Sequence, residues 1–199
     1  MQTTRKIHNL QSLNFLQDCD LRIGIFGGSF NPIHQGHLQL SNQALKFLEL
    51  DYIIWLISLQ NPLKSEYKKD IFYRAREAAK IATHPKVLIS TMEYDVNSNY
   101  AYDSLKILKR KFNSIDFIWL MGADNIQNFY KWHRYEDIPK LCKIVIFDRP
   151  NYSCHFNFSR FVMKFKGMID KNQTNNIISK DIMIYHGIMS KTASSLIRK

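Results

Sequence analysis

The chain has 199 residues, 45% of them hydrophobic, and carries a formal net charge of +11 at pH 7. This length is enough for one α/β domain with a sizeable core, and the hydrophobic content argues against a disordered chain. No apolar run reaches the length of a membrane span, and the N-terminal segment shows no secretory signal.

A positive charge of this size points to polyanions, and polyphosphate substrates, nucleic acid and an anionic membrane surface all qualify. The lysines are spread along the chain, with short clusters only at residues 68–69 and 109–111. The charge therefore indicates polyanionic ligands in general more than RNA in particular.

The cysteines, at positions 19, 142 and 154, have unrelated spacings. They suggest neither a disulfide framework nor a zinc site, which fits a cytoplasmic protein.

Strands and helices are predicted to alternate along the chain. The first 20 residues are polar with scattered Leu and Phe, and we expect a poorly ordered or loosely helical extension before a single domain at residues 21–199. Nearly continuous apolar runs predict buried strands at residues 21–26, 52–58, 87–90, 115–121, 143–148 and 182–185. Apolar residues at helical spacing predict helices near residues 38–48, 71–82, 102–112 and 158–165. This alternation predicts an α/β fold with a doubly wound parallel sheet.

The most informative stretch reads GGSFNPIHQGHL, at residues 27–38, and joins the first strand to the first helix. Gly27 and Gly28 have no Cβ, so the backbone can turn sharply there and a phosphate can approach closely. The free amides at the start of a helix, together with the helix dipole, favour an anion. His34 and His37 are three positions apart, so both can face the same anion.

Each of these features alone also has a structural interpretation, because glycine pairs often follow strands and single histidines are usually structural. Their combination with Ser29, Phe30, Asn31-Pro32 and Gly36 is much more specific. It resembles the signature of the nucleotidylyltransferase superfamily, G-G-x-F-[DN]-P-x-H-x-G-H. The resemblance implies a Rossmann-like nucleotidylyltransferase fold.

Four more residues follow predicted strands, where ligands gather in such folds. Asp124, after the turn at Gly122, suits a ribose hydroxyl but is also suited to capping the next helix. Trp132 suits either the core or stacking on a ligand ring. Lys64 and Arg149 each suit either a phosphate or the solvent-exposed surface.

The chain ends in Ala-Ser-Ser-Leu-Ile-Arg-Lys, at residues 193–199. Ser194 and Ser195 read as a helix N-terminus whose amides and hydroxyls can hold phosphate oxygens. Arg198 follows one turn later and can pair with the same oxygens through two parallel bonds. In the superfamily this segment resembles the I-S-S-T-x-x-R motif, with Ser195 in place of the usual Thr.

Taken together, residues 21–198 resemble the bacterial nicotinate-nucleotide adenylyltransferase family. The resemblance implies that ATP and nicotinate mononucleotide give nicotinate adenine dinucleotide and pyrophosphate, with Mg²⁺ carried by ATP and no tightly bound protein metal. It implies catalytic roles for His34, His37 and Arg198. By position, the residues implied for ATP are Gly27, Gly28, Ser29, Phe30, Gly36, Gly122, Asp124, Ser194 and Ser195. Those implied for the mononucleotide are Asn61, Lys64, Tyr100, Trp132 and Arg149.

One departure from the family pattern concerns the mononucleotide. The family often has Thr where this chain has Ala101, which removes a hydroxyl near the expected pyridine carboxylate. Another adenylyl- or cytidylyltransferase of the superfamily, such as pantetheine-phosphate adenylyltransferase, stays open as an alternative. A basic RNA-binding module is the alternative from another class, although it leaves the histidine pair unexplained. No membrane or nucleic-acid partner is expected, and the oligomeric state is left open.

Overall fold

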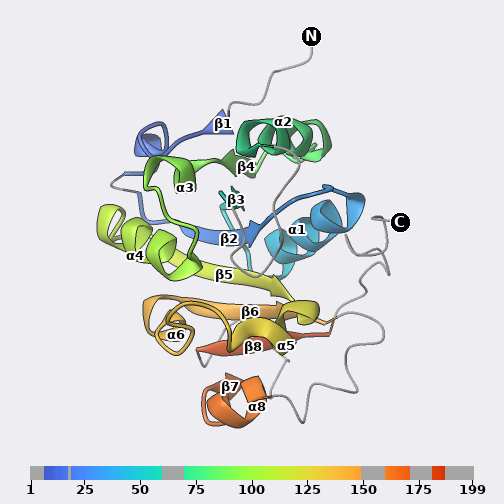
Figure 1. The fold of residues 1–199 in the computed structure, drawn as a ribbon, viewed down its shortest axis with the longest axis vertical. Coiled ribbons are helices and arrows are strands. Elements are labelled where there is room, and N and C mark those ends of the chain that lie inside the picture. Colours follow the sequence, from blue (N-terminus) through green and yellow to red (C-terminus); the bar gives the residue numbers. More distant parts are fainter. Residues whose placement is uncertain (1–6, 18, 60–69, 149–159, 171–180, 187–199) are drawn as a thin grey trace.

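The computed structural model describes residues 7–17, 19–59, 70–148, 160–170 and 181–186. Its strands form an eight-stranded sheet in the order β1-β4-β3-β2-β5-β6-β8-β7, and each pair is parallel (Figure 1). The α/β fold with a doubly wound parallel sheet is thereby confirmed. The strands are β1 (Ile7–His8), β2 (Arg22–Gly28), β3 (Tyr52–Ile57), β4 (Val87–Ser90), β5 (Asp116–Gly122), β6 (Lys143–Phe147), β7 (Ile169–Asp170) and β8 (Ile182–Tyr185).

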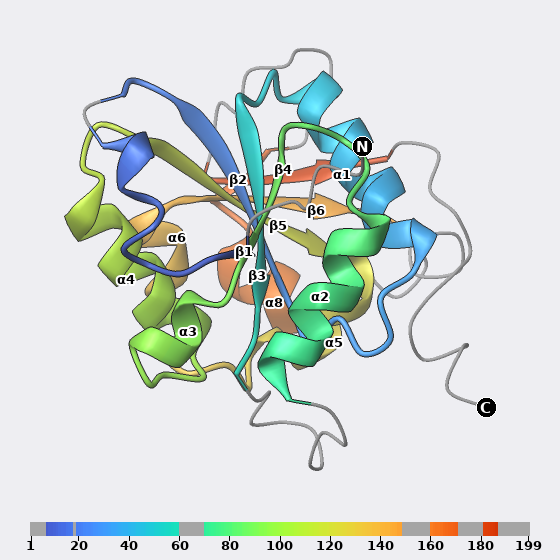
Figure 2. The same cartoon turned by 90° about the horizontal axis from the view of Figure 1, so that it is seen from above.

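Helices cover both faces of this sheet, and Figure 2 shows α1 and α2 on the side opposite α3, α4 and α6. One apolar cluster joins the sheet to α1 (Gln35–Phe47) and α2 (Ile71–Ile81). The other joins it to a second set of elements: η1 (Asn14–Leu16), α3 (Met92–Asp95), α4 (Ala101–Lys111), α5 (Ile126–Phe129), α6 (Ile138–Leu141) and α8 (Arg160–Phe165). The central strands are buried on both faces, which explains their almost continuous apolar sequences.

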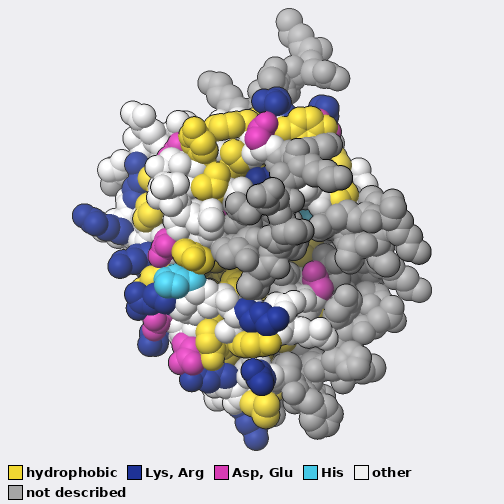
Figure 3. Space-filling model, in the orientation of Figure 1, with side chains coloured by type: hydrophobic (Ala, Val, Ile, Leu, Met, Phe, Trp, Pro, Cys, Tyr) yellow, Lys and Arg dark blue, Asp and Glu magenta, His cyan; other side chains and the backbone are white. Residues whose placement is uncertain are grey.

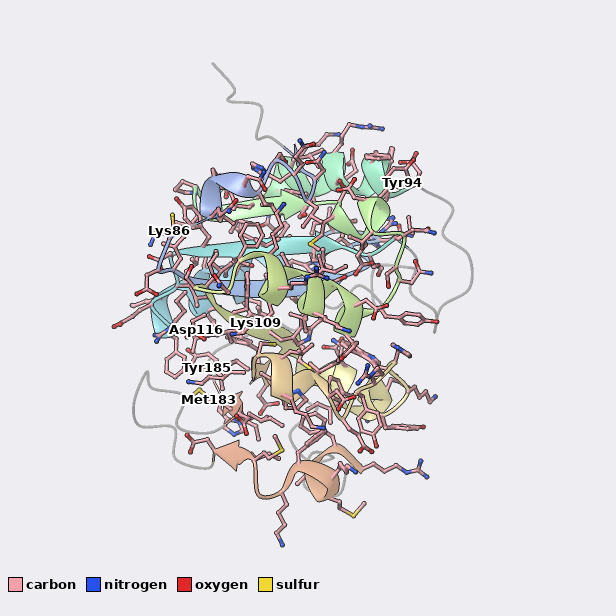
Figure 4. The ribbon with its side chains drawn as sticks, turned by 90° about the vertical axis from the view of Figure 1, so that its left-hand side faces the viewer. Lys86, Tyr94, Lys109, Asp116, Met183 and Tyr185 are labelled. Atoms are coloured by element: carbon pink, nitrogen blue, oxygen red, sulfur yellow. The ribbon has the colours of Figure 1, made fainter. Side chains whose placement is uncertain are left out.

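The strand order reverses between β2 and β5, which lie side by side at the centre of the sheet. From β2 the chain moves outward through β3 to β4, and from β5 it moves outward the other way through β6 to β8. In open sheets of this kind the ligand crevice lies beyond the carboxyl ends of the strands at the reversal. In Figure 4, Lys86, just before β4, and Tyr94, just after it, lie at opposite ends of the sheet. The carboxyl ends of the parallel strands are therefore on the side of Tyr94.

The N-terminal segment packs against the sheet over residues 7–17. Strand β1 pairs with β4, and Leu10 N donates to Asp95 Oδ2 at 2.8 Å. Leu13 and Leu16 are fully buried in the core. A two-residue strand is too short to show an alternating pattern, so its pairing could not be read from the sequence. None of the described helices is long and apolar enough to cross a membrane.

Candidate active site

The loop that follows β2 lies at the reversal point of the sheet. Gly27 and Gly28 are the last residues of β2 and pair with Leu56 and Ile57 of β3. Neither has a positive φ, so the sharp turn expected at this glycine pair is absent there. A Cβ on Gly27 would overlap the indole ring of Trp119 in β5. Packing between neighbouring strands is therefore the physical reason for a glycine at position 27.

The turn itself occurs at Phe30, whose φ of 46° lies in the left-handed region that few residues other than glycine adopt. The Phe30 ring stacks on Trp55 at 5.5 Å between ring centroids and meets Phe26 edge-on at 5.7 Å. This packing holds the unusual backbone conformation in place. Buried aromatic residues therefore support the turn at Phe30.

His34 and His37 bond to each other at the start of α1. His34 is the N-cap residue, and its Nδ1 accepts a hydrogen bond from Gly36 N at 3.1 Å. Its backbone N–H donates to His37 Nδ1 at 3.2 Å, which completes a reciprocal capping box. Because Nδ1 of His34 accepts a bond, the proton of its neutral ring lies on Nε2. The capping box uses the Nδ1 atoms and leaves the Nε2 atoms outside it.

The two imidazole rings are also held by packing, with 3.9 Å between their centroids. The His37 ring lies 5.0 Å from the ring of Phe30 and 6.4 Å from that of Trp55. Trp55 Nε1 donates to Ser41 Oγ at 2.7 Å, and Ser41 Oγ donates to the His37 carbonyl at 2.9 Å. The two histidines, which were predicted to face the same anion, are therefore brought together, and the His37 ring is held by aromatic packing.

Asp124 lies across the reversal point, beyond β5. Phe26 in β2 lies opposite Leu120 in β5, so both strands reach a glycine two residues later, at Gly28 and Gly122. Asp124 is half-buried in η2 (Ala123–Asn125). The N-cap positions of η2 and α5 belong to Gly122 and Asn125, so Asp124 occupies neither. The helix-cap interpretation of Asp124 is therefore not supported.

Two residues expected near the mononucleotide lie close together. Tyr100 is exposed at the N-cap of α4, and its ring centroid lies 4.6 Å from that of His133. Trp132, the preceding residue, is half-buried with its ring edge-on to Trp119 at 6.0 Å. One part of the Trp132 side chain therefore packs against the core, and the rest of it is exposed to solvent. The remaining expected residues, Asn61, Lys64, Arg149, Ser194, Ser195 and Arg198, lie outside the described residues.

Two buried charged residues near the carboxyl ends of β2 and β3, Arg74 and Glu93, were not predicted from the sequence. Arg74 in α2 donates from Nη1 to the Ser29 carbonyl at 2.8 Å. A signal was present, since Arg74 lies three positions after Ile71 and four before Ala78 on the apolar stripe of its helix. Burial raises the pKa of Glu93 to about 7, against the opposing effect of hydrogen bonds from Leu59 and Ser104 and of the nearby Arg74 charge. No sequence pattern marked Glu93.

Comparisons with known proteins concern the sequence and the fold of the chain. The cytidylyltransferase-like family model matches residues 25–199. A protein named probable nicotinate-nucleotide adenylyltransferase from Methylorubrum extorquens (strain PA1) is 39% identical over 134 residues, covering 67% of this chain and 72% of the relative. A protein of the same name from Rhizobium johnstonii is 32% identical over 181 residues, covering 88% of this chain and 91% of the relative.

Among solved structures, the Plasmodium falciparum nicotinic acid mononucleotide adenylyltransferase complexed with APC has a TM-score of 0.63 at 18% identity. The match covers 89% of this chain and 82% of that chain, and it concerns the fold alone. The family model and the two relatives, in contrast, match the amino-acid sequence of this chain. On these grounds the chain belongs to the nicotinate-nucleotide adenylyltransferase family of cytidylyltransferase-like proteins.

Proposed function

We propose that the protein transfers the adenylyl group of ATP to nicotinate mononucleotide, giving nicotinate adenine dinucleotide and pyrophosphate in NAD biosynthesis. The observation that carries the proposal is the pair of His34 and His37, joined by the capping box at the start of α1, beyond the central strand β2. Imidazoles beside the amides of a helix N-terminus favour phosphate groups. Relatives named for this activity support the choice of both substrates.

In the proposed reaction, an oxygen of the mononucleotide 5′-phosphate attacks the α-phosphorus of ATP in line, and pyrophosphate leaves. The attacking oxygen is already anionic, so the protein has no proton to remove. Catalysis then consists of positioning and charge stabilisation. We assign this role to Nε2 of His34 and His37 and to the backbone of residues 27–30.

Other assignments rest on position in the family pattern. We assign Asp124 to the ATP ribose, and Ser194, Ser195 and Arg198 to its β- and γ-phosphates. Tyr100 and Trp132 are assigned to the mononucleotide, together with Asn61, Lys64 and Arg149. Mg²⁺ is expected to enter with ATP, because it prefers oxygen ligands that phosphates and water supply, whereas the histidine pair offers nitrogen.

The proposed partners are small molecules and not nucleic acid. On the described part of the face seen in Figure 3, most Lys and Arg side chains lie along the left-hand edge and at the lower end, with acidic side chains among them. An RNA-binding function would combine clustered basic residues with exposed aromatic ones and would leave the histidine pair without a role. We also propose a cytoplasmic location, on the basis of the unrelated cysteine spacings.

The decisive experiment incubates the purified protein with Mg²⁺, ATP and either nicotinate mononucleotide or its amide, and follows pyrophosphate release. We expect dinucleotide formation with a preference for the acid. Phosphopantetheine or CTP as the only accepted co-substrate would identify a different enzyme of the superfamily. RNA binding without ATP turnover would replace the proposed function with an RNA-binding one.

The C-terminal motif gives a further expected result. Arg198→Ala should raise the KM for ATP by about tenfold, as expected for the loss of a charge-assisted bond to phosphate. The KM for the mononucleotide should change little, because the assigned contact is to the β- and γ-phosphates. Steady-state kinetics with each substrate varied in turn measures both values. Equal, minor changes in the two KM values would remove Arg198 from the site.

A further inference from the structure

Arg74 is 2% exposed, although its guanidinium is permanently charged. A charge buried this deeply needs polar partners, and Arg74 has them in two loops. Nη1 donates to the Ser29 carbonyl at 2.8 Å, and Nη2 donates to the Leu59 carbonyl at 3.0 Å. Ser29 follows β2 and Leu59 follows β3, so one side chain ties together the carboxyl ends of two neighbouring strands.

Glu93 completes the same arrangement from the end of β4. Its Oε2 accepts a hydrogen bond from Leu59 N at 2.9 Å, and its Oε1 accepts one from Ser104 Oγ of α4 at 3.4 Å. Leu59 is thus held at its N–H by Glu93 and at its carbonyl by Arg74. The positive charge of Arg74 also favours the ionised form of Glu93. Arg74 is therefore anchored in a buried network and is not a loose side chain.

The bond from Arg74 sets the direction of one peptide group in the phosphate loop. A trans peptide is planar, and its C=O and N–H point in opposite directions. Because the Ser29 carbonyl points at Arg74, the N–H of Phe30 in the same peptide is directed away from it. Phe30 itself has the unfavourable φ of 46°. Arg74 and the aromatic packing of Phe30 thus act on the same turn.

We propose that Arg74 is a positioning residue for ATP: it holds the Ser29–Phe30 peptide so that the loop after β2 has its phosphate-binding shape before ATP arrives. The inference rests on the proposed function, because it takes ATP as the ligand of this loop. When a site already has its binding shape before the ligand arrives, less free energy is spent on ordering the site, and the ligand binds more tightly. A purely structural role for Arg74 would instead affect folding stability without favouring one substrate.

Arg74→Lys tests the proposal, because lysine keeps the charge and the aliphatic stem but cannot reproduce the planar fork that reaches two carbonyls. Arg74→Gln, which removes the charge, is measured beside it so that the comparison does not depend on one variant. Calorimetric titration with Mg²⁺-ATP and no second substrate should show the Kd for ATP rising by about tenfold. The Kd for nicotinate mononucleotide should change by less than about twofold. A change of this size is smaller than the loss of one hydrogen bond to the ligand would cause.

Ala78→Gly is the matched control, since Ala78 is fully buried one turn further along the same helix. It should lower the melting temperature and leave the Kd for ATP at the parental value. The proposal is overturned if Arg74→Lys and Arg74→Gln bind ATP like the parent. It is also overturned if Ala78→Gly weakens ATP binding as much as they do, or if both substrates are weakened equally. A parent protein that binds ATP but makes no dinucleotide would contradict the proposed function and leave the test of Arg74 intact.

Discussion

His37→Ala is expected to lower kcat by about 10²–10³-fold. This is the typical effect of removing one hydrogen-bond donor that stabilises the charge developing in the transition state. The His37 ring lies 3.9 Å from that of His34 and is enclosed by Phe30 and Trp55. Its orientation is therefore set before the substrates bind, which is the condition under which such a donor is most effective. The KM for ATP should change less than kcat, because the backbone amides of the loop stay in place. Initial rates at saturating concentrations of both substrates give the comparison.

His37 also belongs to the capping box of α1, so its loss has a structural cost of about 1 kcal/mol. Thermal melting and circular dichroism of His37→Ala therefore accompany the kinetics. His84→Ala is the matched control, because His84 lies just before β4, at the opposite edge of the sheet, and should keep parental kcat. A folded His37→Ala variant with near-parental kcat would remove His37 from the catalytic machinery.

The elements that carry the site were predictable because their signals are local. Strands β2, β3 and β5 are almost continuous apolar runs, and each is buried by helices on both faces of the sheet. The spacing of His34 and His37 predicted that both can face the same anion, and the structure places the two rings side by side at the start of α1. The sequence did not reveal that each ring bonds to the backbone of the capping box. Those bonds depend on how the chain enters the helix.

The missed features depend on contacts between distant parts of the chain. Ser29 and Arg74 are 45 positions apart, and no single window of sequence contains both. Gly27 was predicted to lie in a sharp turn, whereas it lies within β2 and leaves room for the ring of Trp119 on the neighbouring strand. Strand β7 spans only Ile169–Asp170, too short for a period to be recognised. Local patterns thus predicted the elements that carry the candidate site, whereas the contacts that support these elements come from long-range packing.

Glu93 gives the second large expected effect, on stability as a function of pH. Burial raises its pKa from 4.5 to about 7 in the folded protein. Between these values the folded state keeps a proton that the unfolded state has released, so the free energy of unfolding falls as pH rises through this range. At ~1.4 kcal/mol per pH unit, the full fall amounts to about 3 kcal/mol. It is complete once the pH exceeds the folded-state pKa.

Glu93→Gln removes the titrating proton and keeps an oxygen that can accept from Leu59 N. Urea unfolding of the parent and of Glu93→Gln at pH 5, 6, 7 and 8 should give similar free energies at pH 5. By pH 8 the parent should lose stability relative to the variant by most of about 3 kcal/mol. Glu77→Gln, at a surface carboxylate paired with Lys80, serves as the control, because it keeps Glu93 and should lose stability between pH 5 and 8 as the parent does. Arg74 opposes burial by favouring the carboxylate, so the two effects compete at this position. A parent-to-variant difference that stays constant from pH 5 to 8 would mean that Arg74 prevails and that Glu93 is ionised throughout.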